Sequence, residues 1–336
     1  MSNVICKVLF LLFFSQSIYG QSYKNLAFEG GGTRGIAYVG AISVLESKHI
    51  MENIRSVCGT SVGAIVASMV ATGYTANEME IVLNDLKVQT FNDGQWIFIG
   101  GQYRIRKQYG WYKGNMLENW MGKIIRKKSG NDNMSFLDLH ELSLKDGHYK
   151  DLYVTATNLS DQKTEVFSWK TYPNMHIKTA VRASMSIPLY YRAVFIDSMG
   201  REVRQKSNVK YKVFVDGGIM ENYPLDIFDS SGVNMETLGL KLERPSQIVC
   251  YNNGESCIAG FDINNFKDYI SAFYNIVIER LNRHISYENE KSRTIYISTG
   301  GISPKVRRLS KKDKNVLYEN GRNAASNFFI KRGNKN

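Results

Sequence analysis

A serine between two glycines is the first feature of this sequence that could do chemistry. Gly59, Ser61 and Gly63 follow a strand expected at 54–58 and precede a run of small residues typical of a helix. Esterases use this arrangement because a strained turn between a strand and a helix exposes the serine hydroxyl at a sheet edge, and the glycines permit close backbone approach. The motif predicts Ser61 as a nucleophile in a turn formed with Gly59 and Gly63. An ordinary helix start rich in small residues is the alternative interpretation.

A glycine-rich loop, Gly30-Gly31-Gly32-Thr33-Arg34-Gly35, lies upstream between an apolar run at 25–28 and a helical pattern at 36–48. Backbone amides without bulky side chains can converge on a developing negative oxygen, as an oxyanion hole requires. The candidate donors for such a hole are Gly30, Gly31, Gly32, Arg34 and Gly35. The same string fits the G-x-G-x-x-G pattern of dinucleotide sites, but no acid stands at the end of a second strand. By itself the loop does not distinguish an oxyanion hole from a dinucleotide-binding site.

A serine nucleophile needs a base, and the sequence offers a carboxylate for this role. Asp216 closes the apolar run 213–215 and is followed by Gly217 and Gly218. Catalytic side chains gather at the carboxyl ends of parallel strands, so Asp216 could accept the serine proton directly. A plain Asp-Gly turn is the alternative. The five histidines share no spacing, and a conventional Ser-His-Asp triad would have to use His284.

The elements around these motifs alternate between strand and helix. Further strands are expected at 151–157, 164–168, 236–242 and 294–298, and helices at 114–128, 175–183, 263–289 and 310–330. This order predicts an α/β fold with a central, mainly parallel sheet sandwiched by helices. Neither an internal repeat nor a separating linker is visible.

Together, the motifs resemble those of the patatin-like phospholipases. The loop 29–35, the turn 59–63 and the Asp-Gly-Gly at 216–218 occur in that family's order, over residues 24–228. The string at 180–188 and Asn222-x-Pro224 also fit. Two departures are Glu29, where plant members have Asp, and Gly218, where they have Ala. Both leave the nucleophile and the base intact.

The resemblance implies a three-layer domain over 24–228 that acts as a lipid acyl hydrolase of phospholipase A or lysophospholipase type. Ser61 would attack the ester carbonyl, Asp216 would accept its proton, and the amides of the glycine loop would hold the oxyanion. Lipid esters are then the partners, and neither a cofactor nor a metal is required. Residues 229–336 are expected to pack on the same domain. A catalytically silent lipid-binding protein with this fold remains the alternative from another class.

The N-terminus predicts export. Residues 1–20 combine one lysine, an unbroken apolar run at 8–14 and a small residue at the end, as a cleaved signal peptide does. The mature protein would be periplasmic or secreted, and its contact with membranes would be peripheral. In an oxidising compartment Cys250 and Cys257 could close a disulfide, whereas Cys58 is expected to be a buried, inert thiol.

The chain has a formal net charge of +12, which favours anionic partners. Residues 101–128 interleave five aromatic side chains with eight Lys or Arg residues, as expected of a face that docks on an anionic membrane. A core-packed amphipathic helix with a solvated basic face explains the same pattern. Nucleic acid is not an expected partner, since no motif for its recognition is present and the N-terminus predicts export.

Overall fold

The fold was analysed in a computed structural model, which describes residues 22–94, 97–205, 208–252, 263–264, 269, 272–273, 276–278, 290–304 and 308–333. The predicted signal segment 1–20, Cys257 and His284 lie outside these residues, as does most of the helix expected at 263–289. Cys250 is disulfide-bonded.

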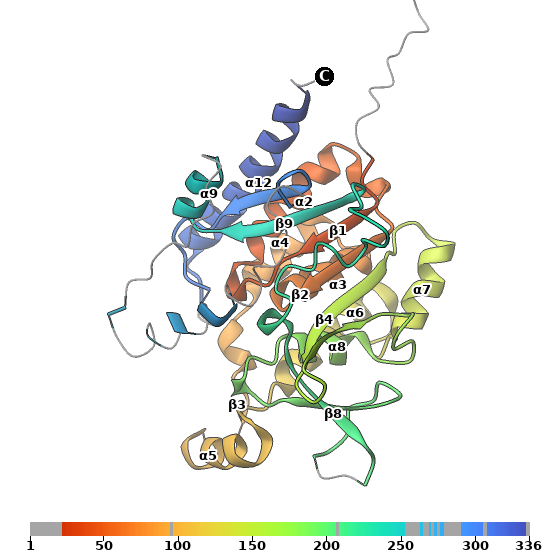
Figure 1. The fold of residues 1–336 in the computed structure, drawn as a ribbon, viewed down its shortest axis with the longest axis vertical. Helices are drawn as coiled ribbons and strands as arrows, with labels where there is room; N and C mark the ends of the chain where they lie inside the picture. The colour runs from red at the N-terminus through yellow and green to blue at the C-terminus, as the bar shows by residue number, and fades with distance from the viewer. Residues whose placement is uncertain are drawn as a thin grey trace, which may run out of the picture.

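The centre of the molecule is an eight-stranded sheet in the order β10-β9-β1-β2-β4-β8-β7, with β5 paired to β4 (Figure 1). From β10 to β4 all neighbours run parallel, whereas β5, β8 and β7 are paired antiparallel. The strands are β1 (Asn25–Phe28), β2 (Ser56–Thr60), β4 (Asp151–Asn158), β5 (Lys163–Phe167), β7 (Val194–Asp197), β8 (Tyr211–Asp216), β9 (Thr237–Glu243) and β10 (Thr294–Ser298). A separate parallel pair joins β3 (Gly110–Tyr112) to β6 (Leu189–Tyr191).

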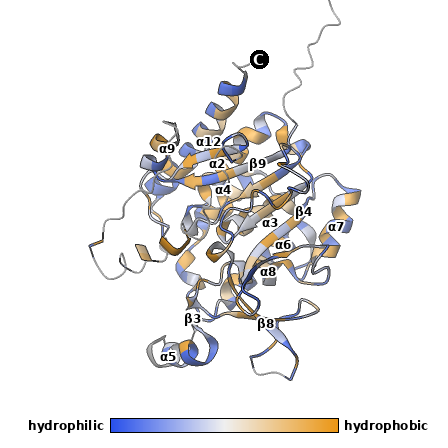
Figure 2. Cartoon of the chain, viewed as in Figure 1, coloured by the Kyte–Doolittle hydropathy of each residue, from blue (hydrophilic) through white to orange (hydrophobic). Residues whose placement is uncertain are grey.

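Helices flank this sheet, and most of the buried apolar side chains lie between them and the strands. They are α2 (Ile36–Ser47), α3 (Val62–Ala71), α4 (Ala76–Asp85), α5 (Ile97–Gln108), α6 (Asn115–Ser129), α7 (Phe136–Lys145), α8 (Ile177–Ser184), α9 (Pro245–Asn252) and α12 (Lys311–Gly333). Short 3-10 turns are η1 (Gly32–Arg34), η2 (Ile50–Glu52), η3 (Val88–Phe91) and η4 (Gly217–Ile219). Figure 2 shows apolar residues concentrated on the central strands and on α3, which is buried along its whole length.

The two faces of the sheet are covered differently. Leu26 and Phe28 of β1 join the large core, whereas Ala27, between them, points to the opposite face, as the two-residue period of a strand requires. There Ala27 contacts Cys58, Tyr223 and Leu225 in a smaller cluster. The Cys58 thiol is buried and donates to the Pro224 carbonyl (3.2 Å). The segment that follows η4 therefore covers the second face near the site.

The region after residue 229 supplies part of the same sheet. Strand β9 lies between β1 and β10, and α12 packs along α2 (Figure 1). The two helices approach closely where glycines replace side chains: a Cβ on Gly40 would lie 1.9 Å from the Tyr318 carbonyl oxygen, and one on Gly321 1.8 Å from that of Ala37. Late and early segments are thus joined backbone to backbone.

The α/β architecture with a mostly parallel central sheet is confirmed. The structure also adds what the sequence pattern did not predict, namely the antiparallel pairing of β8 and β7 and the β3–β6 pair. Within the described part of the chain, no helix has the length and apolar character needed to cross a membrane.

Candidate active site

The predicted nucleophile lies in the turn between β2 and α3. Ser61 has φ 53° and ψ −121°, a conformation that side-chain-bearing residues rarely adopt. The flanking glycines explain how this turn fits: a Cβ on Gly59 would lie 2.3 Å from the Gly63 carbonyl oxygen, and one on Gly63 2.4 Å from that of Phe28. Only residues without a Cβ fit at these two positions, so the Gly-x-Ser-x-Gly spacing is a steric requirement of this turn.

The predicted base lies beside this serine. The Ser61 hydroxyl donates to Asp216 Oδ2 across 3.0 Å, although the two residues are 155 positions apart in the chain. The other carboxylate oxygen, Oδ1, accepts the Gly218 backbone N–H at 2.8 Å. Both side chains are nearly inaccessible to solvent, with 6% of Ser61 and 3% of Asp216 exposed. One carboxylate oxygen thus faces the serine hydroxyl while the other is fixed by the backbone.

Strand register explains how Ser61 and Asp216 meet. In the parallel β2–β4 pair, Thr60 is level with Thr155, so the next residue, Ser61, comes level with Ala156. In the antiparallel β4–β8 pair, Ala156 is level with Asp216. The base therefore reaches the site from the direction opposite to β2, on a strand that ends at the level of the serine. The prediction that Asp216 ends a strand is correct, but the parallel direction assumed for that strand is wrong.

Burial changes the protonation chemistry of Asp216. Desolvation raises the pKa of its carboxyl from 3.8 to about 7, against the opposing effect of the hydrogen bonds from Gly218 and Ser61. A base is most effective when its pKa is close to the working pH, because it is then both available and basic enough to take a proton. The buried position thus brings the pKa of this carboxyl close to neutral pH.

The glycine loop lies beside the serine, but not all of its amides are available. A Cβ on Gly30 would lie 3.5 Å from the Ser61 Cβ, which places the loop against the nucleophile. However, the Gly30 N–H donates to the Asn222 carbonyl (2.9 Å) and the Arg34 N–H to the Gly31 carbonyl (3.4 Å). Gly30 and Arg34, both predicted as oxyanion donors, thus have backbone acceptors for their N–H groups in this structure. In the described part of the chain, Gly31 and Gly32 keep backbone N–H groups without an acceptor.

Arg34 and Gly35 have supporting positions in the loop. The Arg34 Nε–H donates to the Gly31 carbonyl at 2.9 Å, so this side chain braces the loop. Gly35 is the N-cap residue of α2, and a Cβ there would lie 2.7 Å from Val62 Cγ2, next to the turn that holds Ser61. Close packing between the loop and the start of α3 thus depends on a glycine at position 35.

Asn222 joins the glycine loop to the turn that carries the base. Its carbonyl accepts the Gly30 N–H, and its Nδ2 donates to Glu29 Oε1 at 3.1 Å. Its Oδ1 would collide with a Cβ on either Gly30 (2.3 Å) or Gly218 (2.7 Å). Glu29 is also buried, and desolvation raises its pKa to about 8, while its Oε2 accepts the Leu242 N–H at 2.8 Å. This buried carboxyl therefore anchors this end of the loop through the hydrogen bonds that both of its oxygens accept.

Three further residues hold the nucleophile and the base, and sequence reasoning missed them. The Ser184 hydroxyl accepts the Ser61 N–H at 2.8 Å, and the Ser186 carbonyl accepts the Asp216 N–H at 2.9 Å. The Thr157 hydroxyl donates to the Asp216 carbonyl at 2.9 Å. Ser184 and Ser186 belong to the segment 180–188, which had been singled out only through the family resemblance, without a role for either.

The described histidines have other partners than Ser61 and Asp216. His140 hydrogen-bonds Asp151 and stacks on Trp169, while His49 and His148 pair with nearby acids on the surface. His284 lies outside the described residues. Among the residues that the structure describes, no group of three or more His, Cys, Asp or Glu side chains could hold a metal ion.

The basic block at 101–128 divides into paired and unpaired side chains. Arg104 is buried and donates to the Trp111 carbonyl at 2.7 Å, and Lys128 binds both carboxylate oxygens of Glu78 at 2.7 Å. These two cations are therefore part of the folded domain and are not free for a membrane. Exposed cations on α6 remain, at Lys123, Arg126 and Lys127.

A serine in a strained strand-to-helix turn, hydrogen-bonded to a buried aspartate beside a glycine loop, defines a hydrolase-type site on an α/β sheet. The family model of patatin-like phospholipases matches residues 26–229, and the chain belongs to this family. It is 30% identical over 312 residues to the uncharacterised protein R571 of Acanthamoeba polyphaga mimivirus, covering 92% of this chain and 94% of that one. It is 27% identical over 215 residues to the probable lipid hydrolase 463L of Invertebrate iridescent virus 6, covering 64% and 66%.

Solved structures show the same fold. VipD from Legionella pneumophila matches with a TM-score of 0.57 at 19% identity, over 91% of this chain and 66% of VipD. ExoU from the type III secretion system of Pseudomonas aeruginosa matches with a TM-score of 0.54 at 15% identity, over 93% of this chain and 53% of ExoU. The chain thus spans about two thirds of one and half of the other, and these likenesses concern the fold.

Proposed function

We propose that this protein hydrolyses fatty-acyl esters of lipids, with Ser61 as nucleophile and Asp216 as its only proton acceptor. The observation that carries the proposal is the 3.0 Å hydrogen bond from the Ser61 hydroxyl to Asp216, made by a serine held at φ 53°. Membership of the patatin-like phospholipases supports lipid esters as the substrate class, of phospholipase A or lysophospholipase type.

The geometry supports a two-step reaction. Asp216 Oδ2 takes the proton as Ser61 Oγ attacks the ester carbonyl, and the carboxylate oxygen Oδ1 stays fixed by Gly218. The N–H groups of Gly31 and Gly32 stabilise the tetrahedral oxyanion, and the positive end of α3 adds to this. Asp216 returns the proton to the leaving alcohol, then activates the water that releases the acyl group from Ser61. Ester hydrolysis by this route requires neither a cofactor nor a metal.

The proposal is tested with purified wild type and Ser61→Ala against phospholipid, lysophospholipid and soluble esters. Loss of the nucleophile should lower kcat/KM by at least about 1,000-fold. Wild type should also react with a fluorophosphonate probe, and Ser61→Ala should not. The matched control is Ser68→Ala, a buried serine on α3 whose hydroxyl donates to the Ala64 carbonyl away from the site. Equal turnover or labelling in Ser61→Ala would refute the assignment.

A histidine-dependent triad is separated from the two-residue site by His284→Ala. If Asp216 alone serves the serine, this variant retains near-normal activity, whereas a triad predicts a loss of several orders of magnitude. A protein that binds lipid without cleaving it would show no turnover and no fluorophosphonate labelling in the wild type.

Export and membrane contact form the second part of the proposal. The segment 1–20 supports export to a periplasmic or extracellular compartment, and the exposed cations of α6 support peripheral contact with anionic lipid. Reversing Lys123, Arg126 and Lys127 to Glu should weaken sedimentation with anionic vesicles and spare turnover of a soluble ester. Lys145→Glu on α7 is the control. Unchanged vesicle binding in the triple variant would refute the proposed membrane contact of α6.

A further inference from the structure

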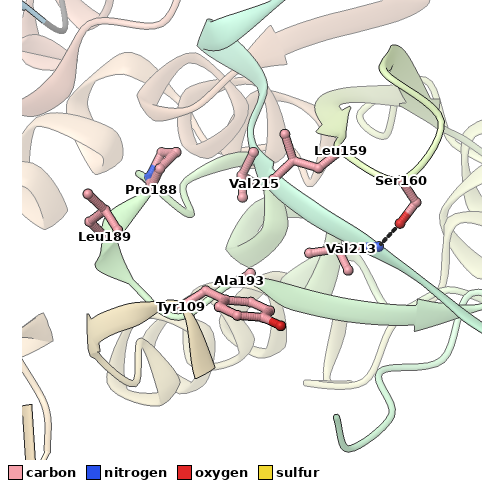
Figure 3. A pocket seen from close by; sticks show the side chains of 8 residues that line it. All are labelled: Tyr109, Leu159, Ser160, Pro188, Leu189, Ala193, Val213 and Val215. Carbon is pink, nitrogen blue, oxygen red and sulfur yellow. Dashed lines mark hydrogen bonds between the residues drawn. The ribbon is translucent and has the colours of Figure 1, made fainter. Parts of the chain in front are cut away.

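A cavity of about 340 Å³ is lined by residues of η3, α6, the turn after α6 and the start of α8. Three cationic side chains lie on its wall, Lys123 and Arg126 from α6 and Lys178 from α8. Its volume falls in the usual range of small-ligand pockets, roughly 300–1,000 Å³. The cavity in Figure 3 differs, because no charged side chain is among the described residues that line it. Charge therefore indicates a ligand class only for the first of these, the cationic cavity.

The charges on the wall of the cationic cavity are not balanced. In the described part of the chain, none of the three cations forms an ion pair, whereas Lys128 on the same helix α6 binds Glu78. Lys123 and Arg126 are also three positions apart on one face of α6, where like charges repel. Asp132 is the acid on this wall, so three cations against one carboxylate leave a surplus of two positive charges.

Lys178 is held at the cavity against the electrostatics of its own helix. It lies in the first turn of α8, where the helix dipole disfavours a cation. Its stem packs against α6, since a Cβ on Gly122 would lie 3.2 Å from Lys178 Cδ. Its Nζ donates to Asn133 Oδ1 at 2.6 Å, which leaves two of its three N–H groups for another acceptor. An anion in the cavity would offset both the dipole and the repulsion between the cations.

The rest of the wall suits an anion with several acceptor oxygens. Phe91 is buried and packs against the Trp120 ring, with 5.4 Å between the ring centroids. Such an apolar side lowers the local dielectric and strengthens the attraction between the cations and a bound anion. The Asn119 amide and the Thr90 hydroxyl add uncharged donors. A phosphate monoester has three terminal acceptor oxygens and a charge of about −1.5 to −2 at neutral pH, which matches the surplus on the wall.

We propose that the cationic cavity binds a phosphate monoester group, at a site separate from Ser61 and Asp216, through Lys123, Arg126 and Lys178. Soluble phosphate compounds and lipids with a terminal phosphate both carry such a group, and the experiment separates these two sources. The lipid source rests on the proposed membrane contact of α6, whereas binding of free phosphate does not.

The first measurement is calorimetric titration with inorganic phosphate. Wild type should bind it with a dissociation constant on the order of 1 mM or below. Lys123→Gln and Lys178→Gln should each weaken binding at least about tenfold, because each removes a charged donor. Asp132→Asn should tighten binding severalfold, since it removes a like charge from the wall. The matched control is Lys127→Gln, an exposed α6 cation that does not line the cavity and should keep the wild-type affinity.

Three results would overturn the site. The first is no binding of phosphate by wild type, and the second is an unchanged affinity in Asp132→Asn. The third is equal weakening in Lys123→Gln and Lys127→Gln, which would show only the general positive charge of α6. Should Lys178→Gln fail to fold, Lys123→Gln and Asp132→Asn still test the site, because Lys123 is exposed and Asp132 is partly exposed.

The second measurement identifies the source of the phosphate group. In a Ser61→Ala background, which prevents turnover, sedimentation is compared with phosphatidylcholine vesicles that contain either phosphatidic acid or phosphatidylglycerol, at matched surface potential. A lipid source predicts a preference for phosphatidic acid that inorganic phosphate and Lys123→Gln both abolish. Equal sedimentation with both vesicles, with inorganic phosphate still bound, would assign the cavity to a soluble phosphate compound. Neither measurement uses turnover, so a failure of the proposed ester hydrolysis would leave both results standing.

Discussion

The parallel and antiparallel halves of the sheet hold the two partners of the site in different ways. On the parallel half, Ser61 sits in a turn whose strain is in the backbone, at φ 53°. On the antiparallel half, Asp216 has an ordinary φ of −48°, and its unfavourable feature is a carboxyl buried away from water. One half stores conformational strain and the other electrostatic strain. The difference teaches that the same hydrogen bond can be weakened by two distinct kinds of change.

The largest expected difference in stability between the two halves comes from replacing one glycine in each half, Gly63 or Gly218, by alanine. In Gly63→Ala, the Cβ would lie 2.4 Å from the Phe28 carbonyl oxygen, which is backbone and cannot move aside, so the free energy of unfolding should fall by about 3 kcal/mol. In Gly218→Ala, the nearest atom is Asn222 Oδ1 at 2.7 Å, a side-chain atom that can rotate. The free energy of unfolding of Gly218→Ala should fall by less than about 1 kcal/mol. Its kcat/KM should nevertheless fall at least about tenfold.

Urea unfolding and ester turnover measure this contrast. Gly147→Ala, where a Cβ meets nothing within 4 Å, is the matched control for both variants. Equal loss of stability in Gly63→Ala and Gly218→Ala would show that the two halves respond alike, contrary to the contrast drawn here.

The pH dependence of activity should follow the antiparallel half. Because the pKa of Asp216 is raised to about 7, its carboxyl becomes protonated below this pH and cannot accept the serine proton. We expect kcat/KM to fall about tenfold for each pH unit below about 7. Glu29, on the parallel half, has its pKa raised to about 8. Glu29→Gln should therefore still show the fall in kcat/KM below about pH 7. If this fall disappeared in Glu29→Gln, it would belong to Glu29 and not to Asp216.

The stability of Asp216→Asn should depend on pH. The pKa of Asp216 is higher in the folded chain than its ordinary 3.8, so the unfolded chain loses this proton first as pH rises. The wild-type free energy of unfolding therefore falls between about pH 4 and pH 7 on account of this group. Asp216→Asn removes the effect and should be more stable than wild type by a few kcal/mol at pH 8, with no advantage at pH 4. A constant difference across pH, by urea unfolding, would contradict the buried-charge explanation.

The smallest expected change in stability comes from relieving the backbone strain at Ser61. Ser61→Gly and Ser61→Ala both remove the hydroxyl, but glycine adopts φ 53° without steric strain. Ser61→Gly should exceed Ser61→Ala in stability by about 1 kcal/mol, equally at pH 4 and pH 8. Equal melting temperatures of the two variants would argue against strain in this turn.

Local signals in the sequence were sufficient for the nucleophile turn. The glycine spacing around Ser61 and the strand expected before it reflect contacts within a few residues, and the structure has β2 and α3 on either side of the serine. The amphipathic pattern of 114–128 likewise corresponds to α6. Such features are visible because the residues that shape them are neighbours in the chain.

Long-range features were not predictable from these signals. The direction of β8 depends on its pairing with β4, which no local pattern in Tyr211–Asp216 encodes. Similarly, the Gly30 N–H donates to the carbonyl of Asn222, 192 residues further along the chain. The paired state of Lys128 depends on Glu78 in another helix. Each of these contacts joins residues whose positions are set by the completed fold.

The close crossing of α2 and α12 has a consequence for biosynthesis. The glycine loop leads directly into α2, whose outer surface at Ala37 and Gly40 is covered by the much later α12. Strand β1 likewise has a neighbour on one side alone until β9 has been translated. A growing polypeptide that has just passed residue 229 therefore presents an open strand edge and a bare helix surface, and both attract chaperones or mispairing. Acquisition of a working site must wait for the synthesis of α12.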